Sequence, residues 1–275
     1  MNKIDELLAS FLNELKENER SLRTIKKYSA DICQFLTSKN ITTLESITKD
    51  ILIAYKCDLV DSCKPSSVNN KIIIINKFLT FAGLENLKLK LLKLQKKTSL
   101  ENVLSVSDYE RLLKYAEKLN KTKTLYTMKV LANTGIRIDE LKFITVEAFK
   151  QGYARVSNKG KIRDIIISKK LSKELKKYCT QAGIKTGVIF ITSNNKPIDN
   201  SCIWRDLKYI AGQARVNKKR VHAHSFRHLF AKEFMSKVNN VVLLADILGH
   251  SSLETTRIYT KSSIKEQRDI LEGII

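Results

Sequence analysis

Residues 224–259 read HSFRHLFAKEFMSKVNNVVLLADILGHSSLETTRIY. The start of this stretch predicts a helix on which His224, Arg227 and His228 are spaced i, i+3 and i+4 and therefore share one face. Such a face combines a permanent cation with two imidazoles, which can bind an anion and transfer a proton. We therefore expect this stretch to carry the chemistry of the protein and the rest of the chain to position it.

The second half of the stretch predicts two further short helices. An apolar pattern runs to Leu248, Gly249 ends it, and His250 follows at once. A capping-box pattern then begins a third helix that ends at Tyr259. Two short helices around a glycine turn are typical of a DNA-binding helix-turn-helix, which is one interpretation. The other is a site that cleaves phosphodiesters, because cations, an acid or base and a nucleophile all occur here.

The spacing of these residues resembles the C-terminal motif of the tyrosine recombinase (phage integrase) family. That motif is H-x-x-R-H, then L-G-H, then a tyrosine nine residues later, and the chain matches it at each position. The resemblance implies that Tyr259 is the nucleophile, that Arg227 binds the phosphate and that His250 donates to a nonbridging oxygen. It implies that His224 either takes the phenolic proton or holds the phosphate.

A second motif lies ahead of this stretch, in the sequence TGIRIDELKFIT. Gly135, Arg137 and Glu140 match the family's first box, G-x-R-x-x-E-L. The resemblance implies that Arg137 is the other phosphate-binding arginine and that Glu140 orients it. A plain surface ion pair is the alternative for these two residues.

Between the two motifs, three short strands are predicted over 146–149, 153–157 and 162–168. Lys159 lies at the tip of the second hairpin, where the family pattern G-K-G-x-K-x-R places a lysine that acts as general acid on the leaving 5′ oxygen. One residue of that pattern is missing here, so Lys161 could take the role instead, and a solvated turn lysine is a further alternative.

Helices are predicted around these strands, over 107–119, 123–134, 171–182 and 201–214. In the last of them Trp204 is expected in the core. The basic run Lys218, Lys219 and Arg220 that follows is expected to contact phosphates, and His222 to be structural.

Residues 1–98 predict four amphipathic helices. The segments ERSLRTIKKYSADICQFL and KPSSVNNKIIIINKFL resemble helices of the family's core-binding domain, a SAM-like helical bundle that clamps DNA. By this resemblance the candidate DNA contacts are Thr24, Lys27, Ser67, Asn69, Asn70 and Lys71. A solvated helix face is the alternative for each of them.

Five lysines and no acid occupy residues 88–97, ahead of an interdomain linker predicted at about 95–102. Lys93, Lys96 and Lys97 would lie along the DNA backbone if the linker follows it, and a solvated helix end is the alternative. We expect a DNA-clamp domain over 1–98 and a catalytic domain over 103–275.

The charge of the chain supports a polyanionic partner. The 275 residues carry a net charge of +22 with a pI near 9.7, and nucleic acid is the default partner for such a protein. Residues 1–100 contribute +6 and the rest +16, although an AT-rich coding bias also raises the lysine content.

Several classes of protein are disfavoured. None of the five cysteines forms a C-x-x-C pair, so neither a zinc site nor a disulfide framework is indicated. No apolar run is long enough to span a membrane, and the N-terminus lacks a signal-peptide core. No acidic trio or glycine-rich loop indicates a metal or ATP. We expect a cytoplasmic, nucleoid-associated protein without a cofactor.

The chemistry implied by the resemblance can be judged by magnitude. A free tyrosine has a pKa of about 10, so ionising it at pH 7 costs about 4 kcal/mol. Each well-placed donor on the transition state is worth roughly 3–4 kcal/mol, so two arginines exceed that cost. A phosphotyrosine bond would then conserve the energy of the broken ester.

The expected fold class is therefore mainly α with a small β-sheet, an α+β chain that joins an N-terminal helical core-binding bundle to a mixed α+β catalytic domain. The expected function is that of a small Xer-like site-specific recombinase on double-stranded DNA, working as a tetramer. The tail after Tyr259 carries apolar residues in an otherwise polar segment, and it would dock on a neighbouring protomer or else pack on its own domain. The alternatives are a type IB topoisomerase, a catalytically dead DNA-binding regulator and a DNA-packaging protein.

Overall fold

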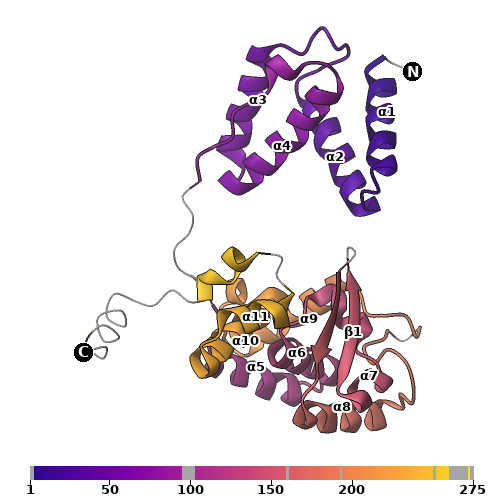
Figure 1. Ribbon diagram of the computed structural model, residues 1–275, viewed down its shortest axis with the longest axis vertical. Coiled ribbons are helices and arrows are strands. Elements are labelled where there is room, and N and C mark those ends of the chain that lie inside the picture. The colour runs from indigo at the N-terminus through magenta and orange to yellow at the C-terminus, as the bar shows by residue number, and fades with distance from the viewer. Residues whose placement is uncertain are drawn as a thin grey trace. The chain divides into compact units, whose positions relative to one another are not determined.

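The computed structural model describes residues 3–94, 103–158, 161–192, 194–249, 252–259 and 272 (Figure 1). The contacts within the chain divide it into two compact units, residues 1–96 and 97–275. Each unit has its own hydrophobic core, and each is described here by itself. Within the described residues, no helix is both long enough and apolar enough to cross a membrane.

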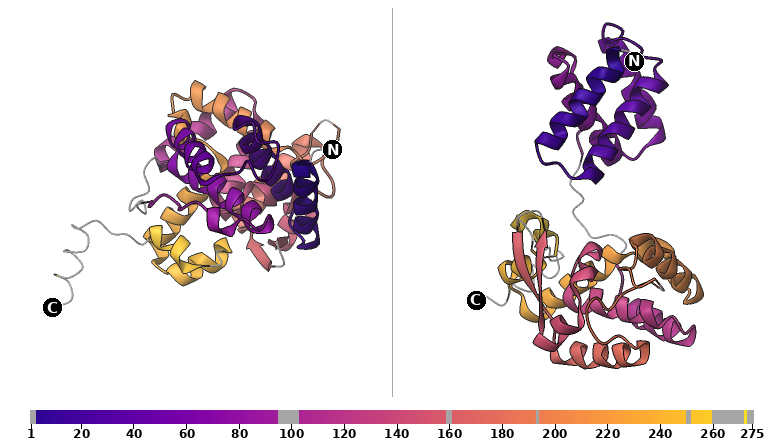
Figure 2. Two further views of the ribbon diagram at one scale, coloured as in Figure 1. Left: turned by 90° about the horizontal axis from the view of Figure 1, so that it is seen from above. Right: turned by 90° about the vertical axis from the view of Figure 1, so that its right-hand side faces the viewer.

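The N-terminal unit is a bundle of four helices, visible from two sides in Figure 2. They are α1 (Lys3–Glu17), α2 (Leu22–Ser38), α3 (Lys49–Ser62) and α4 (Pro65–Phe81), followed by the 3₁₀ turn η1 (Glu85–Leu87). Ser21 and Thr48 cap α2 and α3 through their hydroxyls, and Pro65 opens α4, because these residue types suit a helix start. The isoleucine run 72–75 is helical, as its neighbours' helical spacing predicts.

Asn69 has a structural role that the sequence did not reveal. Its side chain is buried and pairs with the backbone of Leu92, donating to the carbonyl at 3.0 Å and accepting from the N–H at 2.8 Å. Asn76 makes the same pair of bonds with Leu89, both at 2.9 Å. These amides hold the extended chain after η1 against α4. The expectation that Asn69 contacts DNA is therefore corrected, because its polar atoms are used inside the bundle.

The second unit is a helical body with one small sheet at its side (Figures 1 and 2). Its α-helices are α5 (Val106–Lys118), α6 (Thr122–Thr134), α7 (Val146–Gln151), α8 (Lys169–Ala182), α9 (Asn200–Gln213), α10 (Ala223–Val238) and α11 (Val241–Leu248). The 3₁₀ segments are η2 (Ile138–Phe143), η3 (Lys218–Arg220), η4 (Leu253–Thr255) and η5 (Arg257–Tyr259). Helices α6 and α10 pack side by side in the middle; α10 carries residues of the site, and the chain after α6 carries others. The predicted mainly α fold with a small sheet is confirmed.

The sheet of the described residues has two antiparallel strands, β1 (Tyr153–Asn158) and β2 (Lys161–Ile166). The prediction of a further strand at 146–149 is wrong. That segment is α7, because the Thr145 hydroxyl accepts a bond from the Ala148 N–H and starts a helix that Gly152 ends. Residues 188–192 likewise make only isolated bridges, Thr145 with Val188 and Ile191 with Pro197.

The register of the hairpin determines which side chains face the protein. Val156 lies opposite Arg163, and Ala154 lies opposite Ile165. Because side chains alternate along a strand, these four residues share one face, on which Ala154, Val156 and Ile165 are buried. Arg163 therefore points from β2 toward the helices rather than toward solvent.

Trp204 is exposed, with 54% of its surface accessible, so the expectation that it lies in the core is wrong. The buried face of α9 is set one residue earlier, at Ile203, Leu207 and Ile210. The indole instead lies under the Lys208 ammonium, with the nitrogen 5.6 Å from the ring centroid.

Candidate functional site

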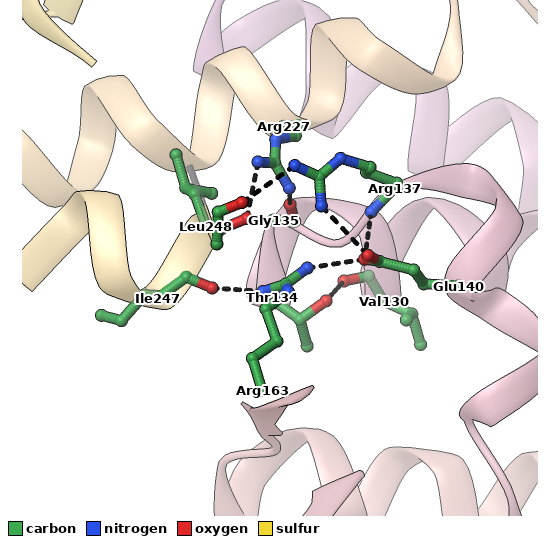
Figure 3. A network of polar contacts seen from close by, with 10 residues as sticks. Val130, Thr134, Gly135, Arg137, Glu140, Arg163, Arg227, Ile247 and Leu248 are labelled. Atoms are coloured by element: carbon green, nitrogen blue, oxygen red, sulfur yellow. Dashed lines mark hydrogen bonds and ion pairs between the residues drawn. The ribbon is translucent and has the colours of Figure 1, made fainter. Parts of the chain in front are cut away.

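Glu140 is a buried carboxylate bound by two arginines. Only 1% of its side chain is exposed, and two guanidiniums form ion pairs with it. The Arg137 backbone N–H donates to Oε2 at 2.8 Å and its Nη1 donates to Oε1 at 3.1 Å. The Arg163 Nη2 donates to Oε2 at 2.6 Å (Figure 3). A buried charge is tolerated only with such partners, so this carboxylate holds both arginines in place.

Arg227 enters the same cluster from α10 and is 1% exposed. Its Nη1 donates to the Gly135 carbonyl at 2.7 Å and its Nη2 to the Leu248 carbonyl at 2.8 Å. Burial and the nearby charges of Arg137 and Arg163 lower the pKa of Arg227 to about 10. The guanidinium is therefore still a cation at pH 7, and its remaining N–H groups can serve an anion.

Two glycines allow these carbonyls to approach the arginines. Gly135 ends α6 and Gly249 ends α11, both with a φ of +63°. A Cβ at Gly135 would lie 2.5 Å from the Phe230 ring, and one at Gly249 would lie 2.4 Å from Cδ of Arg163. Any side chain at either position would therefore collide with the packing that forms the cluster.

The cluster has an excess of positive charge. Arg137 and Arg163 bind Glu140, and Arg227 lies near them; among the described residues, Glu140 is the one carboxylate that these arginines bind. Three cations and one anion leave a net charge of +2 in a place that is buried at Arg227 and open to solvent at Arg137. Such a charge is costly unless an anion occupies the site, so the cluster is suited to bind a phosphate.

Tyr259 lies beside these arginines, on η5, where its ring packs on the apolar side chains of α10 and α11. The phenolic oxygen is hydrogen-bonded to Nδ1 of His228, and the two ring centroids are 5.6 Å apart. Burial raises the pKa of Tyr259 to about 12, against the opposing effect of the Arg227 charge. The phenol is thus neutral at pH 7, and it could act as a nucleophile only if another group accepts its proton.

His224 stands one turn before His228 on the same face of α10. The two rings meet edge to face with centroids 4.5 Å apart. Partial desolvation and then the nearby charge of Arg227 lower the pKa of His224, so its imidazole is mainly neutral at pH 7. A neutral imidazole can either donate or accept at a neighbouring group.

Comparison with known proteins agrees with this arrangement. The sequence model of the phage integrase family matches residues 102–266, and that of the phage integrase N-terminal SAM-like domain matches residues 8–86. The chain belongs to the phage integrase family. Tyrosine recombinase XerA of Pyrococcus furiosus is 25% identical over 274 residues, covering 97% of this chain and 93% of the relative. Tyrosine recombinase XerD of Haemophilus ducreyi is 26% identical, with 94% of each chain covered.

Solved structures of this family share the fold. The XerH site-specific recombinase in its pre-cleavage complex with the difH substrate has a TM-score of 0.71 at 19% identity, covering 94% of this chain and 84% of that one. A lambda integrase dimer bound to a COC′ core site has a TM-score of 0.77 at 16% identity, with 94% and 95% covered. At these identities the likeness concerns the fold alone.

The structure brings together four of the six residues for which the sequence analysis predicts a catalytic role. Arg137, His224, Arg227 and Tyr259 lie close together, although Arg137 precedes η2, His224 and Arg227 lie on α10, and Tyr259 ends η5. Lys159 and His250 lie outside the described residues. At the phenol, the contact in the structure is made by His228 rather than by His224.

His228 and Arg163 are site residues to which the sequence analysis assigned no role. Each had a signal, since His228 is the last residue of H-x-x-R-H and Arg163 the last of G-K-G-x-K-x-R. Neither residue could be assigned a partner from the sequence, because the partners lie 31, 23 and 84 residues away.

The candidate DNA contacts differ in how available they are. The exposed ones are Lys27, Ser67, Asn70, Lys93, Lys218 and Lys219, whereas Thr24 and Arg220 are partly buried. Lys71 is held inside the N-terminal unit by Asp31, with Nζ and Oδ1 2.8 Å apart, and by Gln34. Lys96 and Lys97 lie outside the described residues. No group of three or more metal-ligating side chains occurs among the residues that the structure describes.

Proposed function

We propose that this tyrosine recombinase breaks and rejoins DNA at specific sites through a covalent bond between Tyr259 and a DNA 3′-phosphate. The observation that carries the proposal is the cluster of three arginines around Glu140, with a net charge of +2, beside the phenol that is hydrogen-bonded to His228. A phosphodiester carries one negative charge and gains a second when a phenolate attacks it. The cluster therefore complements the transition state better than the substrate.

In the proposed cleavage step the Tyr259 oxygen attacks phosphorus, and the bond to the 5′ oxygen breaks. The phenolic proton passes to His228, whose Nδ1 is hydrogen-bonded to the phenolic oxygen. Lys159 protonates the leaving 5′ oxygen as general acid, while Arg137, Arg227 and His250 bind the nonbridging oxygens. The 5′ hydroxyl of a second strand reverses the step, so no external energy source is needed.

The raised pKa of Tyr259 adds to the cost of activating the nucleophile. With a pKa of about 12, ionising the phenol at pH 7 costs about 7 kcal/mol. Two arginine donors on the transition state recover roughly 6–8 kcal/mol. General-base help from His228 contributes about another 10²–10⁴-fold. Together these contributions offset the cost of ionising the phenol.

The test is covalent capture on a nicked duplex that carries the recombination site. The wild-type protein should form an adduct that survives a denaturing gel, and Tyr259→Phe should form none while binding the same DNA with similar affinity. Tyr153→Phe is a matched control, since that tyrosine is exposed on β1. An adduct formed by Tyr259→Phe would refute the assignment, and a wild-type protein that binds but never cleaves would indicate a regulator.

The partner is double-stranded DNA, which also accounts for the proposed association with the nucleoid. We propose that exchange takes place in a tetramer, since two duplexes are cut at four strands. The tail beyond Tyr259, which lies outside the described residues apart from residue 272, would dock on a neighbouring protomer. Deleting residues 264–275 should then spare binding to one site and reduce synapsis and recombination, and normal recombination by the shortened protein would refute the docking.

A further inference from the structure

We infer that Arg163 is a positioning residue of the recombinase site, which acts by holding Glu140 and thereby aligning Arg137. The inference rests on the proposed function, because its readout is the cleavage reaction. It adds a residue that would touch neither the DNA nor the phenol.

Arg163 reaches the site from the inward face of β2, and 14% of its side chain is exposed. Its Nη2 donates to Oε2 of Glu140 at 2.6 Å, and its Nη1 donates to the Ile247 carbonyl at the end of α11 (Figure 3). One guanidinium therefore connects three segments that are remote in sequence: the hairpin, η2 and the last turn of α11.

The packing around Arg163 is as specific as its hydrogen bonds. The Gly249 backbone approaches the Arg163 stem so closely that a Cβ would lie 2.4 Å from Cδ and 2.7 Å from Nε. The carbonyl of the same Gly249 accepts a bond from Nη2 of Arg137 at 3.1 Å. Arg163 thus borders both groups that hold Arg137, namely the Glu140 carboxylate and the Gly249 carbonyl.

Only arginine can make this connection. Its planar fork directs two N–H groups at acceptors in fixed directions, whereas a lysine ammonium is a single flexible point of charge. Without Arg163, Oε2 of Glu140 keeps the bond from the Arg137 backbone N–H but loses the shorter, charge-assisted bond from the guanidinium. The carboxylate is then held from one side only, and the Arg137 guanidinium can shift with it. A displacement of about 1 Å in a catalytic site is enough to cost about 10²-fold in rate.

The first experiment compares Arg163→Met and Arg163→Lys with the wild type in single-turnover cleavage of a nicked site and in DNA affinity. Arg163→Met should cleave about 10²-fold more slowly at unchanged affinity. Arg163→Lys should lie between the two, since it keeps the charge and can make one of the two bonds. Arg155→Met is the matched control. Arg155 pairs with Asp164 on the outward face of the same hairpin, with Nε and Oδ1 2.9 Å apart, and should cleave normally.

The second experiment asks whether Arg163 acts through Glu140. Cleavage is measured for Glu140→Gln and for the Glu140→Gln/Arg163→Met double variant. If Arg163 acts by holding the carboxylate, the double variant is no slower than the slower single variant. Losses that multiply would overturn the inference, as would normal cleavage by Arg163→Met. Thermal unfolding is followed in parallel, and a joint loss of folding and DNA affinity in both Arg163 variants would assign the residue to folding alone. Absence of an adduct in the wild type would instead reject the proposed function.

Discussion

At the scale of single residues, the proposed mechanism depends on the contact between Tyr259 and His228, which would activate the nucleophile. The phenol is neutral because burial raises its pKa to about 12, and it is bonded to an imidazole on the adjacent helix. His228 is therefore placed to accept the proton as the oxygen attacks phosphorus. The arginines can then act on the charge that this transfer creates.

This arrangement predicts a pH-dependent defect for His228→Ala. The substrate carries sulfur in place of the 5′-bridging oxygen, so that its leaving group needs no proton. At pH 7 the variant should cleave it about 10²–10⁴-fold more slowly than the wild type does, because nothing accepts the phenolic proton. Since the pKa of Tyr259 is raised to about 12, its ionised fraction grows about tenfold per pH unit below that value, and the defect should shrink steadily toward pH 9. His222→Ala is the control and should behave as the wild type. A defect that stays constant with pH would mean that His228 only holds the ring.

At the scale of elements, the length of the turn between β1 and β2 bears on which lysine acts as the general acid. The register pairs Asn158 with Lys161, so only residues 159 and 160 lie between the strands. The tip is one residue shorter than the family pattern that carries the general acid. Which of Lys159 and Lys161 protonates the leaving oxygen therefore depends on which ammonium group can reach it.

We expect Lys159→Ala to slow cleavage of an ordinary substrate by about 10²–10⁴-fold. A 5′-bridging sulfur should restore most of the loss, because a thiolate leaves without a proton. Lys161→Ala should cost far less and show no such rescue. An exchange of the two phenotypes would assign the acid to Lys161, and equal small effects would remove both lysines from the mechanism.

The turn after α6 is the second element on which the site depends. The effect of close packing at its glycine, Gly135, can be measured separately from the effect of its positive φ. Gly135 and Gly183 both end helices with positive φ, at +63° and +68°, but only Gly135 has neighbours where a Cβ would stand. Gly183→Ala should lower the free energy of unfolding by about 1 kcal/mol through backbone strain alone. Gly135→Ala should lower it by about 3 kcal/mol, since overpacking adds to the same strain. Urea unfolding of the second unit measures both, and equal losses would contradict the close packing at Gly135.

At the scale of the whole molecule, the net charge of +22 predicts that DNA affinity falls steeply with salt. Each phosphate contact contributes about −0.9 to the slope of log affinity against log salt concentration. Lys93, Lys96 and Lys97 are candidates for such contacts, and Lys93, which the structure describes, is exposed.

Replacing Lys93, Lys96 and Lys97 together by alanine should flatten that slope by roughly 2–3 units. The control removes the same charge from Lys173, Lys176 and Lys177 on α8, which packs against α6 and α7 rather than around the arginines. The control should leave the slope unchanged. Equal effects of the two triple variants would mean that the basic segment has no special contact with the DNA.

Much of this protein was determined by local sequence. Apolar spacing and capping residues predict most of the helices, because a helix depends on neighbours three and four residues away. Arg137, His224, Arg227 and Tyr259 could be identified because their types and spacing follow a family pattern, and the structure places all four in one cluster. Their catalytic roles stay a prediction until the variants are measured.

Only the tertiary structure decided which groups these residues meet. Residues 146–149 look like a strand, yet the Thr145 cap and the packing of α7 make them helical. Trp204 is exposed although it was expected in the core, because the apolar stripe of α9 begins one residue earlier. Asn69 is buried although it was expected at the surface, because its side-chain amide bonds to the backbone of Leu92. The arginine cluster depends on contacts across 23, 84, 92 and 112 residues, and a buried carboxylate with such partners leaves no periodic signal in the sequence.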